Sequence, residues 1–413
     1  MSTHVNPDLV VLVAAIVGLG VAAQFLAAKY RVPSVLFLVV AGIVIGPEGV
    51  GLVTLEAVGG TLSTIVGVSV AIIVFEGSFR LELAGIGNTP RAVGRLVTIG
   101  AAIALFGTAV AVRVLLGPSW DIAFLVGALL VATGPTVITP ILAVVPVREE
   151  VATTLEVEGI VNDVTAAILA TVLFKAMTAR HLAPGGYVML FVERLATGIL
   201  IGLLVAAAVW MLLTRVELSA RAAPQTARLL VFAGAVVAFA AADSIFSEAG
   251  IAAAATAGFT LGNLELPHRE SIEQFKRDVT VLVLSFVFIT LAALLEFAEL
   301  LALGVAGLAV VVILMVVLRP LLVFVSTAGD VFTVRERLFI SFAGPRGIIP
   351  ASVATLFAIR LRTDAPPTDP AGADILLGTV FLVILVTVVV EAGFARRIAG
   401  ALGLLEVGDR SKG

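Results

Sequence analysis

Long apolar runs alternate with short polar stretches along most of the chain. Thirteen of these runs are long enough to cross a hydrocarbon core of about 30 Å. They cover roughly residues 9–27, 33–47, 57–79, 91–116, 121–145, 151–178, 188–214, 225–245, 248–263, 275–295, 299–327, 334–361 and 371–402. The pattern therefore predicts an all-α polytopic membrane protein with about 13 transmembrane helices.

Composition supports a membrane protein and removes several kinds of chemistry. Hydrophobic residues make up 60% of the chain and charged residues 13%, whereas a soluble domain carries about 25% charged residues. There is no cysteine, and His4, His181 and His268 all fall in the N-terminal tail or in loops. We therefore expect no resident cofactor and no enzymatic activity. A net charge of −3 without a basic run argues against binding to nucleic acid.

Lysine and arginine are distributed unevenly between the two sides of the predicted bundle. When the loops are assigned to alternating sides, eighteen of these residues fall on one side and five on the other. Because loops rich in Lys and Arg stay in the cytoplasm, we expect the N-terminus outside and the C-terminus inside. Residues 1–404 would form one membrane unit, and 405–413 a short cytoplasmic tail.

One short pattern occurs twice, as Gly-Pro-x-x-Ile-x-Pro at 134–140 and again at 344–350. Proline lacks an N–H donor and clashes with the preceding helical turn, so each copy should interrupt a helix. Interrupted helices in two halves of a membrane chain point to a transporter binding site, although two unrelated proline kinks are the alternative. The residues expected at the breaks are Gly134, Pro135, Pro140, Gly344, Pro345, Gly347 and Pro350.

A second pattern, Ala-Gly-x-x-Ile/Leu-Gly, occurs at 41–46 and at 257–262. These copies are 216 residues apart, close to the 210 residues that separate the two Gly-Pro copies. The chain therefore divides into repeat one at about 9–178, a linker helix at 188–214 and repeat two at about 225–402. An odd number of helices separates equivalent positions, so the second repeat should enter the membrane from the opposite side. This is an inverted-topology repeat.

Polar residues inside the apolar runs mark a candidate ion site. In the sixth run, Asp163 lies about 18 Å along the helix, near the bilayer midplane. A midplane aspartate is costly and by default marks a proton or ion site, with a structural salt bridge as the alternative. Arg319 and Arg346 are the only Lys or Arg residues in mid-membrane stretches, and one should pair with Glu158. Glu76 lies near the cytoplasmic end of its run, where a solvent-facing role and a functional role both remain open.

Together these residues resemble the monovalent cation/proton antiporter superfamily, and within it the NhaP-like branch related to eukaryotic sodium/proton exchangers. The resemblance spans nearly the whole chain. It rests on Thr133-Gly134-Pro135-Thr136, Gly344-Pro345-Arg346-Gly347, Glu158 followed by Asn162-Asp163, and Phe75-Glu76-Gly77.

The resemblance implies a prokaryotic plasma-membrane homodimer with a dimerisation domain and a six-helix core domain that moves like an elevator. It implies that Asp163 binds the cation or the proton, and that Arg319 pairs with Glu158. Arg346 would steady the crossed breaks. Hard monovalent cations prefer oxygen ligands, so the candidate ion- and proton-binding residues are Asp163, Asn162, Glu158, Thr133, Thr136 and Glu76.

Two positions depart from the family pattern, because Gly134 replaces a common Asp and Gly159 a frequent Ser. Asn162 in place of a second aspartate is typical of electroneutral members. We therefore expect electroneutral exchange of Na⁺, and of Li⁺ as well, for H⁺. Potassium/proton exchange is the first alternative. A sodium-coupled symporter of organic anions, or a channel or signalling subunit without transport, are the others.

Overall fold

The computed structural model describes residues 7–30, 32–52, 61–81, 91–178, 184–216, 222–293, 297–363 and 369–405, and within these ranges all regular structure is helical. The first half contains α1 (Pro7–Tyr30), α2 (Ser34–Ile45), α4 (Thr61–Phe79), α6 (Arg91–Arg95), η1 (Leu96–Gly100), α7 (Ala101–Leu116), α8 (Trp120–Leu129), α9 (Pro135–Val144) and α10 (Glu149–Thr178). The middle helix is α11 (Pro184–Arg215).

The second half contains α12 (Ala223–Ile245), α13 (Ala249–Gly262), α14 (Arg269–Ala293), α15 (Phe297–Ala302), α16 (Gly304–Val312), η2 (Ile313–Leu318), α17 (Arg319–Ser326), α18 (Val334–Phe342), α19 (Ile348–Thr363), α20 (Pro370–Thr387), η3 (Val388–Ala392) and α21 (Gly393–Ala401). Each predicted apolar run overlaps one continuous helix, except that the two Gly-Pro runs each contain a pair of half-helices and the run 299–327 begins in the short α15 before α16. Among the described residues, seven helices are long and apolar enough to cross a membrane, and four shorter apolar helices accompany them. The all-helical polytopic fold is thus confirmed.

Local signals in the sequence set where several helices begin. The Ser119 side chain accepts a hydrogen bond from the amide of Ile122 at 3.3 Å and caps α8. Thr333 and Glu336 form a reciprocal capping box at the start of α18. These caps satisfy amides that have no partner within the first helical turn.

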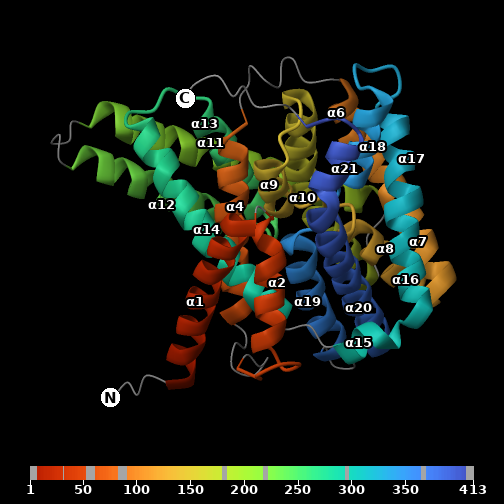
Figure 1. Cartoon of the computed structure of the whole chain (residues 1–413). Coiled ribbons are helices and arrows are strands. Elements are labelled where there is room, and N and C mark those ends of the chain that lie inside the picture. Colours follow the sequence, from red (N-terminus) through yellow and green to blue (C-terminus); the bar gives the residue numbers. More distant parts are fainter. Residues whose placement is uncertain are drawn as a thin grey trace.

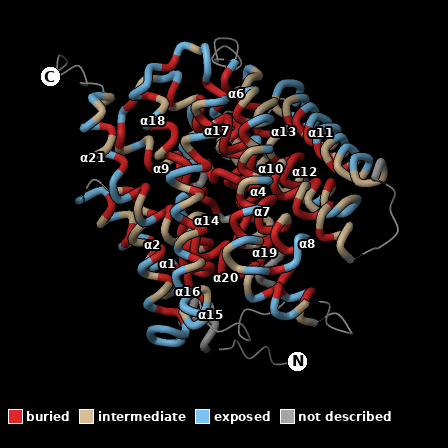
Figure 2. Tube along the Cα trace, turned by 90° about the vertical axis from the view of Figure 1, so that its right-hand side faces the viewer, coloured by how far each residue is buried: buried red, intermediate tan, exposed pale blue. Residues whose placement is uncertain are grey.

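The helices are arranged around a buried centre. In Figure 1, α9 and α10 lie in the middle, α11 to α13 lie on one side, and α7, α16 and α17 lie on the other. Figure 2 shows that buried residues concentrate in the interior, whereas the outer helices expose one face. Large apolar side chains are exposed on those faces, including Phe25, Phe106 and Val305, as expected for surfaces in contact with lipid.

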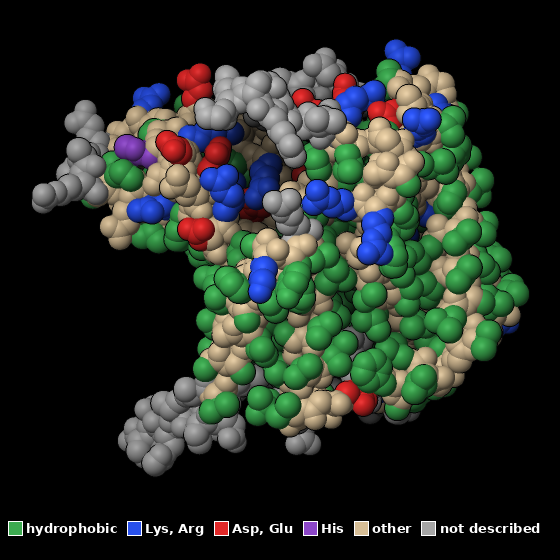
Figure 3. All heavy atoms as spheres, in the orientation of Figure 1, with side chains coloured by type: hydrophobic (Ala, Val, Ile, Leu, Met, Phe, Trp, Pro, Cys, Tyr) green, Lys and Arg blue, Asp and Glu red, His purple; other side chains and the backbone are tan. Residues whose placement is uncertain are grey.

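Charged side chains gather at one end of the molecule. We call the end at the top of Figure 1, where α6 and α18 lie, the upper face. Figure 3 shows Lys, Arg, Asp and Glu side chains concentrated at the upper face, while hydrophobic side chains cover most of the surface below. This division matches the expected boundary between a polar interface and the hydrocarbon core.

The repeated Ala-Gly pattern packs two pairs of helices closely in an equivalent way. A Cβ added at Gly42 would clash with the carbonyl of Ile289 on α14. In the second copy, a Cβ added at Gly258 would clash with the carbonyl of Phe75 on α4. Small residues let helix backbones approach in this manner. The inverted orientation of the two repeats stays a prediction.

Both Gly-Pro runs contain an interrupted helix. The chain is unwound at 130–134, between α8 and α9, and at 343–347, between α18 and α19. The prediction that Pro140 and Pro350 belong to the breaks is wrong, because both lie inside the helices that follow. Pro350 is tolerated because amides in a first turn have no helical partner, and Pro140 leaves only one carbonyl free.

Candidate functional site

The helix α10 carries the central residue of the candidate site. Asp163 is fully buried at 0% exposure, and neither carboxylate oxygen has a hydrogen-bond partner among the described residues. The Oδ1 atom of Asn162 and the hydroxyl of Thr133 are also buried without a partner in the described part of the chain. Helix α10 packs against both α8 and α9, so Asp163 belongs to a helix that borders the first break.

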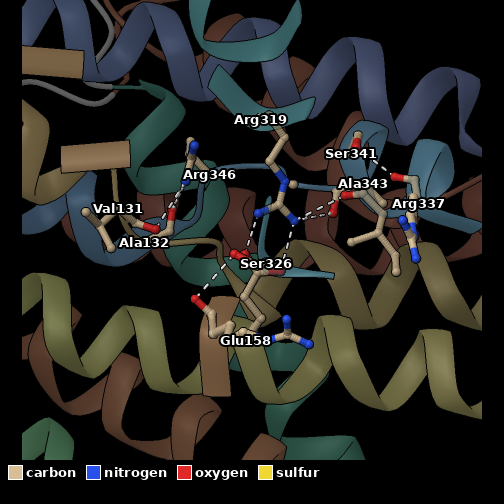
Figure 4. Close-up of polar contacts among 12 residues, drawn as sticks. Val131, Ala132, Glu158, Arg319, Ser326, Arg337, Ser341, Ala343 and Arg346 are labelled. Atoms are coloured by element: carbon tan, nitrogen blue, oxygen red, sulfur yellow. Dashed lines mark hydrogen bonds and ion pairs between the residues drawn. The ribbon is translucent and has the colours of Figure 1, made fainter. Parts of the chain in front are cut away.

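Glu158, on the same helix, is fully engaged with an arginine. Arg319 approaches it with both terminal nitrogens, and its Nη2 donates to Oε2 at 2.9 Å. The same Nη2 contacts the carbonyls of Ile340 and Ala343, at 3.2 Å and 3.3 Å, where α18 ends. Figure 4 shows the guanidinium lying between Glu158 and Ala343. Of the two arginines considered from the sequence, Arg319 is therefore the one that pairs with Glu158.

A glycine at the second break makes room for this ion pair. A Cβ built on Gly344 would lie 2.5 Å from the Nε of Arg319. A larger residue here would push the guanidinium away from Glu158. The glycine in the second Gly-Pro pattern thus makes space for a side chain.

Arg346 joins the two breaks. Its Nη1 donates to the carbonyls of Val131 and Ala132, at 3.2 Å and 2.9 Å, which the first break leaves without helical partners (Figure 4). The amide of Gly134 also donates to the carbonyl of Pro345 at 3.0 Å. The two unwound stretches are therefore in direct contact, as the resemblance implied for crossed helices.

The sequence interpretation missed Glu391 and Thr387 on the last long helix. Glu391, at 3% exposure, accepts a hydrogen bond from the amide of Gly344 at 2.7 Å. Thr387, one turn earlier, accepts from the amide of Arg346 at 3.2 Å. Both side chains stabilise unpaired amides of the second break. The signal was present, because Glu391 is a lone acid in the apolar stretch Val388-Val389-Val390-Glu391-Ala392.

Glu76 lies at a separate cavity. Its carboxylate is buried and accepts a hydrogen bond from the Nε of Arg80 at 2.5 Å. The role of Glu76 in transport stays a prediction. Glu76 and Arg80, together with Pro140 and Arg277, line a cavity of about 450 Å³ between α1, α2, α4, α9 and α14. Among the described residues, those that line this cavity do not include Asp163. Figure 3 shows a hollow bordered by charged side chains in the upper half of the molecule.

Two other residues named from the sequence are described only in part. The side chains of Pro135 and Thr136 lie outside the described residues. Pro135 is the first residue of α9, where proline fits well, and Gly134 precedes it in an extended conformation.

The buried charges define what this layer can do chemically. Asp163, Glu158 and Glu391 are acidic, and Arg319 and Arg346 are basic. If all five are ionised, the layer carries one net negative charge. Buried charge without compensation is costly, so the arrangement favours uptake of one monovalent cation or one proton.

Comparison with known proteins agrees with this chemistry. The family described as sodium/hydrogen exchanger, transmembrane, matches residues 11–399. The chain is 27% identical over 399 residues to Na(+)/H(+) antiporter 1 of Methanocaldococcus jannaschii, covering 91% of each protein. It is 28% identical over 382 residues to the K(+)/H(+) antiporter NhaP2 of Shewanella sp. strain ANA-3. That alignment covers 92% of this chain but 64% of the relative.

A solved structure shows the same architecture. The sodium proton antiporter MjNhaP1 from Methanocaldococcus jannaschii, determined at pH 8, superposes with a TM-score of 0.80 at 25% sequence identity. The match covers 95% of this chain and 98% of that chain. With a family match from residue 11 to 399 and a shared fold over nearly its whole length, this chain belongs to the sodium/hydrogen exchanger family of membrane transporters.

Proposed function

We propose that this protein exchanges sodium ions for protons across a membrane and that Asp163 binds either ion. The observation that carries the proposal is the complete burial of Asp163 without a hydrogen-bond partner among the described residues. A buried carboxylate in this position gains a counter-ion at little structural cost. The charged residues near it, Glu158 and Arg346, already have hydrogen-bond partners, which leaves Asp163 free to take the transported ion.

The two ions would compete for one carboxylate. Asp163 supplies the charge, and oxygen atoms of Asn162, Thr133 and Thr136 together with freed backbone carbonyls complete the shell around the cation. Glu158 is held by Arg319, so it contributes structure rather than a second exchangeable charge. Each cycle then moves one cation against one proton. Transport weakens as protons displace sodium toward acid pH.

Sodium is favoured over potassium by the comparisons. The relative named as a sodium antiporter aligns over 91% of its own length, whereas the relative named as a potassium antiporter aligns over 64%. Potassium/proton exchange is the second candidate because the sequence identities to the two relatives are almost equal.

The setting of the exchanger is part of the same proposal. The protein would act as a homodimer in the plasma membrane of a prokaryote, without a cofactor beyond the transported ions. Its N-terminus would lie outside and the upper face in the cytoplasm. The concentration of Lys and Arg at the upper face in Figure 3 supports this orientation. The curated relatives come from prokaryotes.

Proton flux in liposomes tests the proposal. Purified protein is reconstituted, a proton gradient with an acidic lumen is imposed, and a pH-sensitive dye follows its dissipation when NaCl, LiCl, KCl or choline chloride is added outside. We expect Na⁺ and Li⁺ to dissipate the gradient, with choline at the level of empty liposomes. A response to K⁺ alone would establish the second candidate, and no response to any cation would overturn cation/proton exchange.

A further inference from the structure

Glu391 occupies a position that neither helix packing nor backbone satisfaction alone accounts for. It is the single acid of η3, it is almost completely buried, and it contacts the second break through the amide of Gly344. A glutamine would satisfy that amide without placing a charge in the membrane interior. The carboxylate therefore calls for an electrostatic explanation.

The explanation lies in the charge of Arg346. Arg319 has a carboxylate partner in Glu158, whereas within the described part of the chain the Arg346 guanidinium donates hydrogen bonds to the neutral carbonyls of Val131 and Ala132. Arg346 also interacts electrostatically with three buried acids, most with Glu391 and then with Glu158 and Asp163. If Asp163 alone balanced it, the ion site would already be neutral and would attract a cation only weakly.

We propose that Glu391 is a positioning residue for ion exchange, which balances the charge of Arg346 and so leaves the charge of Asp163 available to the transported ion. The proposal rests on the exchange function proposed above and adds a residue outside the two broken helices and α10. Glu391 acts through Arg346 and does not need to contact the cation.

The surroundings of Glu391 support this assignment. The basic groups that interact with it are Arg319, at the η2–α17 boundary, and Arg346, in the second break. Helices α2 and α9, which also pack against η3, contain no charged residue. Arg396 and Arg397 on α21 are exposed. Glu391 interacts with Arg319 at least as strongly as with Arg346. Arg319 already has the carboxylate of Glu158, so Arg346 is the arginine that depends on Glu391 for a counter-charge.

The proposal predicts an unusual dependence of KM on pH. Removing the negative charge of Glu391 weakens the binding of sodium and of protons to Asp163 by the same factor, because each brings one positive charge. The factor is on the order of tenfold for one buried charge at an effective dielectric constant of about 20. At alkaline pH the apparent KM follows sodium affinity alone and rises. At acid pH the apparent KM depends on the ratio of the sodium and proton affinities, so the variant and the wild-type protein have the same KM.

The experiment compares wild-type protein with Glu391→Gln in liposomes, with sodium titrated at several pH values. The amide oxygen of glutamine still accepts a hydrogen bond from Gly344, so the main change is the lost charge. We expect KM for sodium to rise about tenfold at alkaline pH and to stay unchanged at acid pH. The onset of proton inhibition should move about one pH unit toward acid, since tenfold equals one unit.

Thr387→Val is the matched control. It removes the neighbouring hydrogen bond to the second break, at the amide of Arg346, without changing charge. A purely structural role for this helix face would give both variants the same pattern, namely a lower rate at every pH. An alkaline KM for Glu391→Gln equal to that of wild type, or a rise of equal size at all pH values, overturns the proposal.

Glu391→Asp decides the matter if the glutamine variant does not fold. It keeps the charge but shortens the reach to Gly344, so wild-type KM values at both ends of the pH range support the proposal and a raised alkaline KM refutes it. Sodium-dependent thermal stabilisation of the purified proteins reports binding without transport. It separates the two proposals, because a wild-type protein that binds no sodium refutes the exchange function itself.

Discussion

At the scale of single residues, the buried charges fall into two groups that differ in their partners. Glu158 and Arg319 satisfy each other, and Arg346 and Glu391 are held by backbone groups of the two breaks. Asp163 stands apart with two unpartnered oxygens in the described structure. Networks of the first kind hold a geometry, whereas an isolated buried carboxylate is suited to exchange its counter-ion.

Replacing Asp163 by asparagine should abolish sodium-driven proton flux while leaving the fold intact. The substitution removes the exchangeable charge at nearly constant volume, and no hydrogen bond to this carboxylate is lost within the described residues. Dye-monitored flux in liposomes should fall to the level of empty liposomes, and size-exclusion elution should match wild type. Flux above background in a folded variant would remove Asp163 from the mechanism.

The Arg319–Glu158 pair gives a second prediction at this scale. Either single change, Arg319→Met or Glu158→Gln, leaves its partner buried without compensation, which costs about 3–5 kcal/mol. Neutralising both should recover most of that loss. Thermal unfolding in detergent checks this expectation, with the two single variants as controls. A double variant as unstable as the sum of the singles would show that the two side chains are not coupled.

At the scale of helices, the fold depends on two kinds of glycine. Gly344 gives space to the Arg319 guanidinium, and the paired glycines of α2 and α13 let these helices touch the backbones of α14 and α4. The contacts are equivalent in the two halves of the chain. The short repeated pattern therefore sets the close spacing of α2 against α14 and of α13 against α4.

Gly258→Ala should destabilise the protein because its new methyl group meets the backbone of Phe75 rather than a flexible side chain. Overpacking of this kind typically costs about 1–3 kcal/mol. The control is Gly18→Ala on α1, where an added Cβ meets nothing within 4 Å. We expect a lower unfolding temperature for the first variant and an unchanged or slightly higher one for the second. Equal unfolding temperatures would contradict close packing of α13 on α4.

Much of this arrangement could be predicted from the sequence, because apolar length and Gly-Pro punctuation act locally. The helical runs and both breaks follow from such signals. The role of Pro140 was misjudged, since this proline lies in the middle of α9 and leaves only one carbonyl without its helical partner. Glu391 was missed because its partners come from distant segments, and a lone acid near the end of an apolar run resembles an interfacial residue.

At the scale of the whole molecule, the charges buried around the two breaks predict the stoichiometry of the proposed exchange. Three acids and two arginines leave one negative charge when all are ionised. In the proposed exchange, one cation or one proton restores neutrality, so we expect both loaded forms to carry no net charge around the breaks. A carrier of this kind crosses the bilayer without sensing the membrane potential.

We therefore expect sodium-driven proton flux to be independent of voltage. A potential is imposed on the liposomes with valinomycin and a potassium gradient, and flux is measured at several pH values. The initial rates should agree within error at zero, positive and negative potential. A protonophore with valinomycin in empty liposomes serves as the control for the imposed voltage. A flux that scales with voltage would show that a second charge moves in each cycle.

The hydrogen bond from Gly134 to the carbonyl of Pro345 has a mechanical consequence. Together with the two bonds from Arg346, it fastens the halves of two helices into a single cassette. No half-helix can swing open by itself without breaking these bonds, so gating has to occur at the cassette's borders with its neighbours. We expect the Gly134 amide to exchange with deuterium as slowly as amides inside α10, during turnover as well as at rest. Fast exchange during turnover would mean that the two breaks separate during transport. The ion would then move between them, and the cassette would not carry it as one rigid body.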